Sequence, residues 1–383
     1  MQRRDFLQSA ATGALALTAW NDALQDMEDP RQRLLSEGPV KLTRDGLDLE
    51  PKEYTWLLGE LAKHPSMQED SYSRGGVVAA LEEAFAQAVG KERAVFFPTG
   101  TLANHVAIRR LCEGRGRRVV VPAESHLFND CGDCCQTLSG LHLIPVGPGS
   151  PTVTTAALND VVERTATGRV AMPLGALMIE SPVRRQSNRR QDFDEMQAVT
   201  RRAAELGMGR HLDGARIFTE SIFSGISVKT YAAMFDTVYV SLYKAFHTPT
   251  GAVLTGPADL LDGLYHERRM FGAGLPRVWP FAAVALLFLD GMKVRMSEAK
   301  RRGDIILAAL KKSGDFDVTV FPDGTNVVLL RPHVADLDAY AARVRKRGVR
   351  LPKAHGDPAH FAIKINETLL RREPDAVLAA LRL

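Results

Sequence analysis

Several features that would narrow the class of protein are scarce in this sequence. Its 383 residues include only 4 cysteines, and 49 basic side chains nearly balance 45 acidic ones, which gives a net charge of +4. The arginines are scattered and not interleaved with aromatic residues, whereas nucleic-acid binding usually concentrates positive charge on one face. Beyond the N-terminus no uninterrupted apolar run approaches the roughly 20 residues that a membrane-spanning helix needs. We therefore expect no nucleic-acid partner and no membrane insertion of the mature chain.

Three of the four cysteines are neighbours in the sequence, as Cys131, Cys134 and Cys135. A Cys-x-x-Cys pair occurs in redox sites and as half of a zinc site. No second pair of ligands follows at a spacing typical of zinc, so we expect no metal site. The pattern favours ordinary thiols near an active site, and in an exported protein it is also compatible with a local disulfide.

The first 20 residues differ in kind from the rest of the chain. Arg3-Arg4-Asp5-Phe6-Leu7 is followed by apolar and small residues from Ser9 to Ala19. A positive stretch followed by a short apolar run is the layout of an export signal, and it is too short for a stable anchor. The adjacent arginines before Phe-Leu are similar to a twin-arginine signal. We expect residues 1–20 to direct export and the mature chain to be periplasmic.

Beyond residue 50, short apolar runs alternate with longer segments of helical periodicity. This alternation predicts an α/β fold with a mostly parallel sheet and helices on both of its faces. Ligands of such sheets bind at the carboxyl ends of the strands. We expect a linker and N-terminal arm over 21–50, a large domain over 51–289 and a smaller C-terminal α+β domain over 290–383. The expected strands are 94–97, 118–122, 176–179, 210–212, 237–241 and 252–254, and the expected helices are 77–89, 104–111, 197–206 and 281–292.

Two of the segments that follow expected strands suit a phosphorylated aromatic ligand. In Pro98-Thr99-Gly100-Thr101, backbone N–H groups at the start of a helix and two hydroxyls suit a phosphate, although a plain turn capped by Thr101 explains the segment as well. In His211-Leu212-Asp213-Gly214-Ala215-Arg216, Asp213 can keep a pyridine nitrogen protonated. Arg216 can bind a carboxylate through two hydrogen bonds. A salt-bridged surface turn is the alternative for this second segment.

Two further segments carry a nucleophile and an imidazole. Lys244 comes just after the apolar strand that ends at Ser241, where burial lowers the pKa of an amine and frees it to attack an aldehyde. A lysine that snorkels from the edge of a sheet is the alternative. His126, in Ser125-His126, can stack on a flat ring or move protons, whereas a single histidine in a loop usually does neither.

In order and spacing, these segments resemble the threonine aldolase/β-eliminating lyase family, which has fold type I of the enzymes dependent on pyridoxal phosphate. The similarity runs from about Glu69 to Leu289, and a weaker similarity is found at Thr325-Asn326. It implies a PLP-dependent transferase fold. The segments that carry it are Asp70-Ser71-Tyr72-Ser73, Gly90-Lys91-Glu92, Thr99-Gly100-Thr101 with Asn104, Ser125-His126-Leu127, Glu180, His211 to Arg216, Ser241-Leu242-x-Lys244 with Gly251, and Arg269-x-x-Gly272-x-Gly274-x-x-Arg277.

The resemblance implies pyridoxal 5'-phosphate as the cofactor and an amino acid as the substrate. Lys244 is then expected to carry the cofactor as a Schiff base and to transfer protons. Asp213 is expected to pair with the ring nitrogen, and His126 to stack on the ring. We also take His126 as the candidate base for a β-hydroxyl proton. The residues expected to hold the phosphate are Thr99, Gly100 and Thr101.

The resemblance also implies how the substrate is bound and how the chain assembles. Arg216, beside the cofactor, and Tyr72 are expected to bind the substrate. A glycine-rich loop is expected to approach the cofactor of a neighbouring subunit, which implies a homodimer or homotetramer. The loop residues concerned are Gly272, Gly274 and Arg277.

Three features of the family have no clear counterpart, and all three concern the substrate. The nearest text to the early Ser-Asp segment is Leu42-Thr43-Arg44-Asp45, and the second histidine before the strand ending at Glu180 is missing. Near the C-terminus Lys364 stands where an arginine is expected, and it lacks the guanidinium fork.

We expect a PLP-dependent carbon–carbon lyase that splits a threonine-like β-hydroxy-α-amino acid into glycine and an aldehyde. One alternative is another reaction of the same cofactor, β-elimination or racemisation. The other is an exported cofactor-binding protein without catalysis.

Overall fold

The central feature of the structure, a computed structural model that describes residues 3–25 and 27–383, is a seven-stranded sheet. Five neighbouring strands run parallel to one another. The next strand is antiparallel to this set, and the edge strand beyond it is antiparallel to that strand in turn. This arrangement confirms the expected α/β class. In spatial order the strands are β2 (Arg93–Phe97), β8 (Ala252–Gly256), β7 (Thr237–Ser241), β6 (Gly209–Asp213), β5 (Leu174–Glu180), β3 (Arg118–Pro122) and β4 (His142–Val146).

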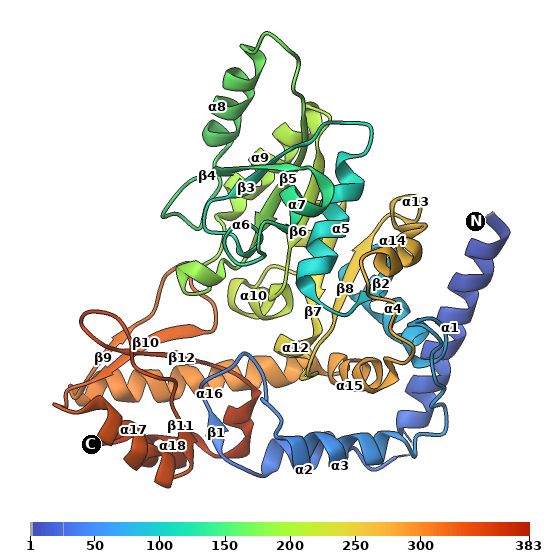
Figure 1. Cartoon of the computed structure of the whole chain (residues 1–383). Helices are drawn as coiled ribbons and strands as arrows, with labels where there is room; N and C mark the ends of the chain where they lie inside the picture. Colours follow the sequence, from blue (N-terminus) through green and yellow to red (C-terminus); the bar gives the residue numbers. More distant parts are fainter. Residues whose placement is uncertain (1–2, 26) are drawn as a thin grey trace.

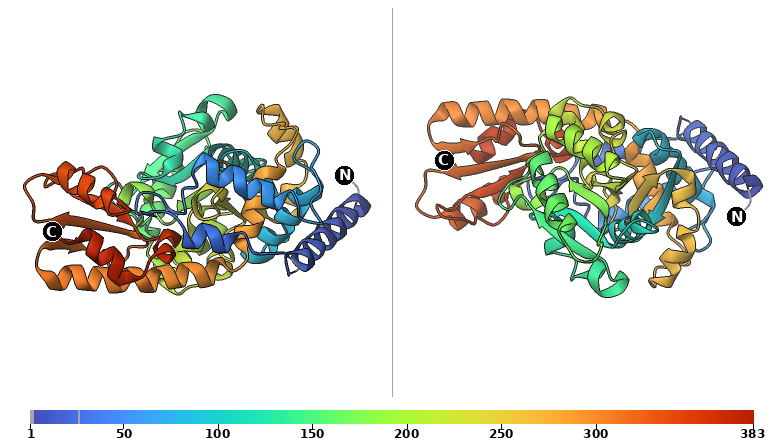
Figure 2. Two further views of the ribbon diagram at one scale, coloured as in Figure 1. Left: turned by 90° about the horizontal axis from the view of Figure 1, so that it is seen from below. Right: turned by 90° about the horizontal axis from the view of Figure 1, so that it is seen from above.

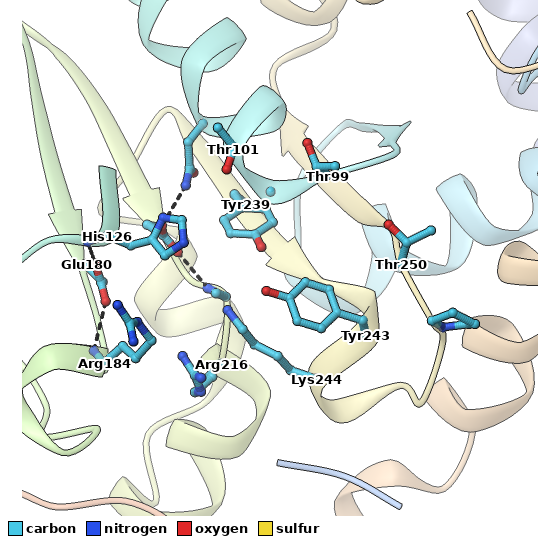
Figure 3. Close-up of a pocket in the computed structure, with 15 residues that line it drawn as sticks. Thr99, Thr101, His126, Glu180, Arg184, Arg216, Tyr239, Tyr243, Lys244 and Thr250 are labelled. Atoms are coloured by element: carbon cyan, nitrogen blue, oxygen red, sulfur yellow. Dashed lines mark hydrogen bonds between the residues drawn. The ribbon is translucent and has the colours of Figure 1, made fainter. Parts of the chain in front are cut away.

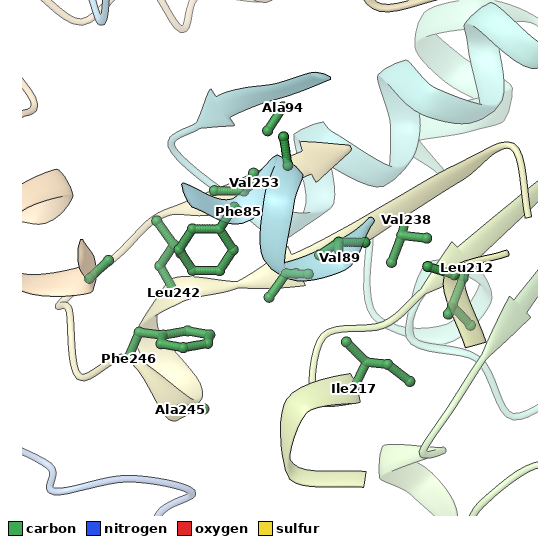
Figure 4. Close-up of a cluster of buried hydrophobic side chains, with 14 of the residues drawn as sticks. Phe85, Val89, Ala94, Leu212, Ile217, Val238, Leu242, Ala245, Phe246 and Val253 are labelled. Atoms are coloured by element: carbon green, nitrogen blue, oxygen red, sulfur yellow. The ribbon is translucent and has the colours of Figure 1, made fainter. Parts of the chain in front are cut away.

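Helices cover both faces of this sheet, as the alternation of buried side chains requires. In β7, Val238 and Val240 belong to the core beneath α4 (Gly76–Val89), whereas Tyr239 belongs to the core on the side of α5 (Gly100–Cys112). Figure 4 shows Phe85 and Val89 of α4 with strand residues that include Val238 and Val253. Other helices around the sheet are α8 (Thr155–Ala166), α9 (Phe193–Glu205), α10 (Ile217–Ser224), α11 (Val228–Ala232), α13 (Ala258–Leu261), α14 (Leu264–Met270) and α15 (Trp279–Leu289).

A second, smaller core lies at the end of the long helix α16 (Met292–Ser313), far from the N-terminus (Figures 1 and 2). It contains an antiparallel sheet in the order β12 (Phe361–Lys364), β10 (Val327–Pro332), β9 (Phe316–Thr319). The segment before residue 50 joins this core, because β1 (Val40–Lys41) pairs in parallel with β11 (Val349–Arg350). The remaining elements of this part are α17 (Leu337–Lys346), η2 (Glu367–Arg371) and α18 (Pro374–Leu381).

The N-terminal segment is helical over α1 (Arg3–Gln25) and packs against α4. Trp20 is buried, and its ring stacks on His64 with centroids 4.0 Å apart. Residues 1–2 of the expected signal lie outside the described residues. The expected linker contains α2 (Arg31–Ser36), and α3 (Pro51–Leu61) follows it. Within residues 3–25 and 27–383, no helix combines the length and apolar composition that crossing a bilayer requires.

Several helix boundaries differ from the sequence prediction; for example, α9 begins at Phe193 rather than Gln197. Helix α5 begins at Gly100 rather than Asn104, because Thr99 caps it by accepting a hydrogen bond from Leu102 N at 3.3 Å. The helix expected to run to Met292 ends at Leu289, since Gly291, with φ +66°, separates α15 from α16. Strand β4 and helix α8 were not predicted. The short elements near the cavity described below are α6 (His126–Asn129), α7 (Cys134–Ser139), η1 (Arg184–Gln186) and α12 (Leu242–Ala245).

Candidate active site

A cavity of about 220 Å³ lies at the carboxyl ends of β5, β6 and β7, the position expected for a ligand of a parallel sheet (Figure 3). Glu180 and Asp213 end β5 and β6, and Lys244 follows β7 in the short helix α12. The structure thus brings together side chains from five separate parts of the sequence. The expected site residues that line the cavity are Thr99, Gly100, Thr101, His126, Asp213, Arg216 and Lys244.

Lys244 has the environment of a reactive amine. Among the described residues, no carboxylate lies within ion-pair distance of its Nζ, and its side chain opens onto the cavity. Burial, together with the positive charge of Arg216, lowers the pKa of Lys244 to about 7. A substantial fraction of the amine is therefore neutral near pH 7, which is the form that attacks a carbonyl carbon.

Asp213 is held by a chain of buried hydrogen bonds. Asn104 Nδ2 donates to Asp213 Oδ2 at 2.6 Å, and the backbone N–H of Ala215 donates to Oδ1 at 3.1 Å. Asn104 Oδ1 lies 2.8 Å from His211 Nε2, and His211 Nδ1 lies 2.8 Å from the Thr237 hydroxyl. Burial lowers the pKa of His211 to about 4, so the ring is neutral, donates from Nε2 and accepts at Nδ1. The carboxylate of Asp213 is therefore fixed in orientation.

Asn104 was expected only as part of the phosphate segment, and its role in orienting Asp213 was missed. The bond joins residues 109 positions apart. A hydrogen-bonding side chain at the fifth position of a helix carries no sequence signal for such a partner. Of this pair, only Asp213, at the end of a strand, could be recognised from the sequence as a functional residue.

The start of α5 forms one wall of the cavity. Thr99 is the N-cap, so the alternative of a turn capped by Thr101 is wrong. The N–H groups in the first turn of a helix have no partner within the helix and attract anions. A Cβ at Gly100 would lie 2.0 Å from the Tyr239 hydroxyl, so only glycine fits at this point. The geometry suits a phosphate group close to the backbone.

His126 is the first residue of α6 and extends into the cavity (Figure 3). Its backbone N–H donates to Glu180 Oε2 at 2.5 Å, while Arg184 N donates to Oε1 at 2.9 Å. Glu180 therefore anchors the loop that carries the imidazole. Burial and the nearby charge of Asp213 raise the pKa of Glu180.

The imidazole itself has one close partner outside the cavity. Its Nδ1 lies 3.1 Å from Cys131 Sγ. This hydrogen bond raises the pKa of His126. Cys131 is thus part of the site, although the sequence indicated only that thiols lie nearby.

Arg216 lines the cavity but is already paired. Its Nε and an Nη lie 3.1 and 3.0 Å from Asp45 Oδ2, and Lys364 Nζ lies 3.0 Å from Asp45 Oδ1. Burial acts to raise the pKa of Asp45, but Arg216 and Lys364 hold it well below its usual range. Two cations around one carboxylate leave one positive charge. Asp45 belongs to Leu42-Thr43-Arg44-Asp45, the segment most similar to the missing Ser-Asp motif.

Tyr72 and the glycine-rich loop lie outside this cavity. Tyr72 is 43% exposed, its backbone N–H donates to Pro276 O at 2.9 Å, and its ring lies 5.1 Å from the Arg269 guanidinium carbon. Arg277 pairs with Glu69 at 3.1 Å, and Gly272 has φ +78°. Tyr72 is therefore not among the residues that line the cavity of its own chain. A role for Tyr72, Gly272, Gly274 and Arg277 at the cavity of a second copy stays a prediction.

Comparison with known proteins gives this geometry a context. A family model described as beta-eliminating lyase matches residues 62–332. A low specificity L-threonine aldolase of Escherichia coli (strain K12) is 27% identical over 284 residues, which cover 73% of this chain and 82% of that protein.

Solved structures show the same fold. An Exiguobacterium sp. 255-15 protein, provisionally assigned as an aromatic amino acid beta-eliminating lyase/threonine aldolase, aligns with a TM-score of 0.75 at 24% identity, covering 92% of this chain and 99% of that chain. A structure of SPT with a PLP internal aldimine aligns with a TM-score of 0.60 at 16% identity, covering 89% and 87%.

We expect the amine of Lys244 to titrate near pH 7 in the ligand-free protein, because burial and Arg216 both disfavour its charged form. Reductive methylation with ¹³C-formaldehyde followed by an NMR pH titration measures this directly. The resonance that titrates near pH 7 should be absent from the Lys244→Met variant. A spectrum in which every lysine titrates only in the ordinary range above pH 9 would contradict the prediction.

Proposed function

The chain belongs to the beta-eliminating lyase family, and from that premise we propose that it cleaves a threonine-like β-hydroxy-α-amino acid to glycine and an aldehyde. Its cofactor is pyridoxal phosphate. The observation that carries the proposal is the convergence of a desolvated lysine, an oriented aspartate and a helix N-terminus on one cavity. The similarity to the threonine aldolase of Escherichia coli supports the choice of reaction.

The residues of the cavity fit this cofactor. Lys244 offers an amine that is partly neutral near pH 7 to the cofactor's aldehyde. Asp213 presents a fixed carboxylate to a ring nitrogen. The cradle at Gly100, which a Cβ would fill, admits a phosphate against the start of α5. The imidazole of His126 lies between these groups, where it suits the face of a flat ring.

When bound, the cofactor supplies an electron-withdrawing ring that stores the electron pair released at the substrate's Cα. Asp213 keeps a proton on the ring nitrogen, which that withdrawal requires. His126, from its Nε2, removes the proton of the β-hydroxyl; the Cα–Cβ bond then breaks, and its electrons remain on the Cα side as the aldehyde leaves. Lys244, which lines the same cavity, would return a proton to Cα through its amine. Glycine and the aldehyde together account for all atoms of the substrate.

We assign the substrate's carboxylate to the cluster of Arg216, Asp45 and Lys364. The cluster carries one uncompensated positive charge, which suits a single carboxylate. Arg216 offers a planar fork for it, and Lys364 supplies a second, compact charge from β12. Burial of the cluster strengthens the attraction relative to water. This places the small C-terminal core at the substrate side of the cavity.

The proposed reaction is tested by measuring aldehyde release from L-threonine, L-allo-threonine and L-phenylserine. We expect release from at least one of them, and a loss of about 100-fold or more in Lys244→Ala, because both the cofactor's anchor and a proton carrier are removed. Lys293→Ala, at an exposed position of α16, is the control and should retain activity.

Other products would identify other reactions. Pyruvate and ammonia would indicate β-elimination, and loss of optical rotation without cleavage would indicate racemisation. A cofactor band that no amino acid perturbs would contradict an enzymatic role.

We further propose a homodimer or homotetramer in which Tyr72 and the loop from Gly272 to Arg277 face the cavity of a second copy. The exposure of Tyr72 outside its own cavity supports this arrangement. Light scattering should give two or four times the mass of one chain, and Arg277→Glu should weaken the assembly by placing a negative charge beside Glu69. A monomer at micromolar concentration would exclude the proposal.

We also propose that residues 1–20 direct export through the twin-arginine route. Conversion of the pair by Arg3→Lys and Arg4→Lys should retain the chain in the cytoplasm, because the signal depends on the two arginines. The same change at Arg201 and Arg202, an adjacent pair within α9, should leave export unaffected. Equal distribution of the two double variants between cytoplasm and periplasm would argue against an export signal.

A further inference from the structure

Cys131 occupies a position between two functional groups of the cavity. It lies in the loop between α6 and α7 and is partly buried. Its Sγ is 3.1 Å from His126 Nδ1 and 3.6 Å from Thr101 Oγ1. Thr101 lies in the first turn of α5, where the phosphate cradle begins. One thiol therefore touches both the imidazole and the helix start.

We propose that Cys131 is a positioning residue for His126: its sulfur accepts the proton on Nδ1, and its own S–H donates to the Thr101 hydroxyl. This arrangement leaves Nε2 of the neutral ring with a free lone pair toward the cavity. The inference rests on the proposed function, in which Nε2 takes the β-hydroxyl proton. The reversed arrangement, with S–H donating to Nδ1, would place a proton on Nε2 and prevent that step.

The protonation state of the thiol is consistent with this direction of hydrogen bonding. Its neighbour Cys134 and burial together raise the pKa of the Cys131 thiol, so it stays protonated at neutral pH. The hydrogen bond with Cys131 is the main cause that raises the pKa of His126, as expected where Nδ1 donates and the sulfur accepts. An acceptor for the S–H is present, because the Thr101 hydroxyl lies within reach.

No other side chain takes this role in the described part of the chain. Asp130, which precedes Cys131 in the sequence, is bonded to Arg184 instead of the imidazole. Glu180 accepts from the backbone N–H groups of His126 and Arg184 and not from the imidazole. The remaining charges near the ring are Asp213, which raises its pKa, and Lys244, which lowers it. Orientation of the ring therefore depends on the thiol.

The test is the tautomer of His126, read by long-range ¹H–¹⁵N NMR of the holoenzyme under reducing conditions. We expect the Nδ1–H form in the wild type and in Cys131→Ser, whose hydroxyl can make both bonds. Cys131→Ala should lose the preference. Thr101→Val combined with Cys134→Ala, which removes both neighbouring acceptors of the S–H, should move the ring toward the Nε2–H form, because the thiol then turns its proton to Nδ1. Cys112→Ala, which removes a buried thiol at the far end of α5, is the control.

The pH profile of kcat/KM provides a second readout. Removal of the thiol should lower the pKa of His126, so in Cys131→Ala the acid limb should move to lower pH while the plateau falls by about 3- to 10-fold, the effect of losing one hydrogen bond. Cys131→Ser should restore both. An unchanged tautomer and acid limb in Cys131→Ala would overturn the proposal. Because the tautomer is read without turnover, a wrong choice of reaction would leave that result interpretable.

Discussion

The hydrogen bond from Asn104 to Asp213 is the contact on which the cofactor half of the site depends. It ties α5, whose first turn is the proposed phosphate cradle, to the end of β6, where we propose that the Asp213 carboxylate pairs with a ring nitrogen. The cradle and the carboxylate are thereby held at a fixed separation. His211 extends the link to Thr237 on β7, the strand that leads directly to Lys244. Because every member is buried and satisfied, the network gives three elements one relative position.

The fold could be predicted from sequence where a segment is locally self-consistent. Val77 to Val89 has helical spacing and a terminal glycine, and the structure shows α4 ending at Gly90 with φ +78°. Boundaries set by single side chains were predicted less well, as at Thr99 and Gly291. Strand β4 was missed although Leu143, Ile144 and Val146 are apolar, because Pro145 interrupts the run and a proline is tolerated only in an edge strand such as this one. The pairing of β1 with β11 joins residues about three hundred positions apart and depends entirely on tertiary packing.

The residues of the site fall into the same two groups: those that the sequence marks locally, and those that only tertiary contacts reveal. Lys244, Asp213 and the start of α5 are read from sequence because each follows a strand, and all strands of a parallel set deliver their carboxyl ends to one edge. Asp45, Asn104 and Cys131 acquire their roles only from partners. Asp45 meets Arg216 across 171 positions, and no local pattern marks either residue for the other. Sequence therefore indicates which chemistry is present, whereas the contacts decide how it is oriented.

The charge of the Arg216, Asp45 and Lys364 cluster explains how a lysine can stand where the resemblance predicts an arginine in the proposed substrate site. An arginine in place of Lys364 would carry the same charge on a planar fork, whereas the lysine places a compact charge 3.0 Å from Asp45 Oδ1. With Asp45 between them, the two cations are held together despite their repulsion, and burial keeps their combined field strong. The remaining single positive charge matches a monocarboxylate. We propose that this match selects substrates with one free carboxylate, because Asp213 and Glu180, which also line the cavity, would repel a second one.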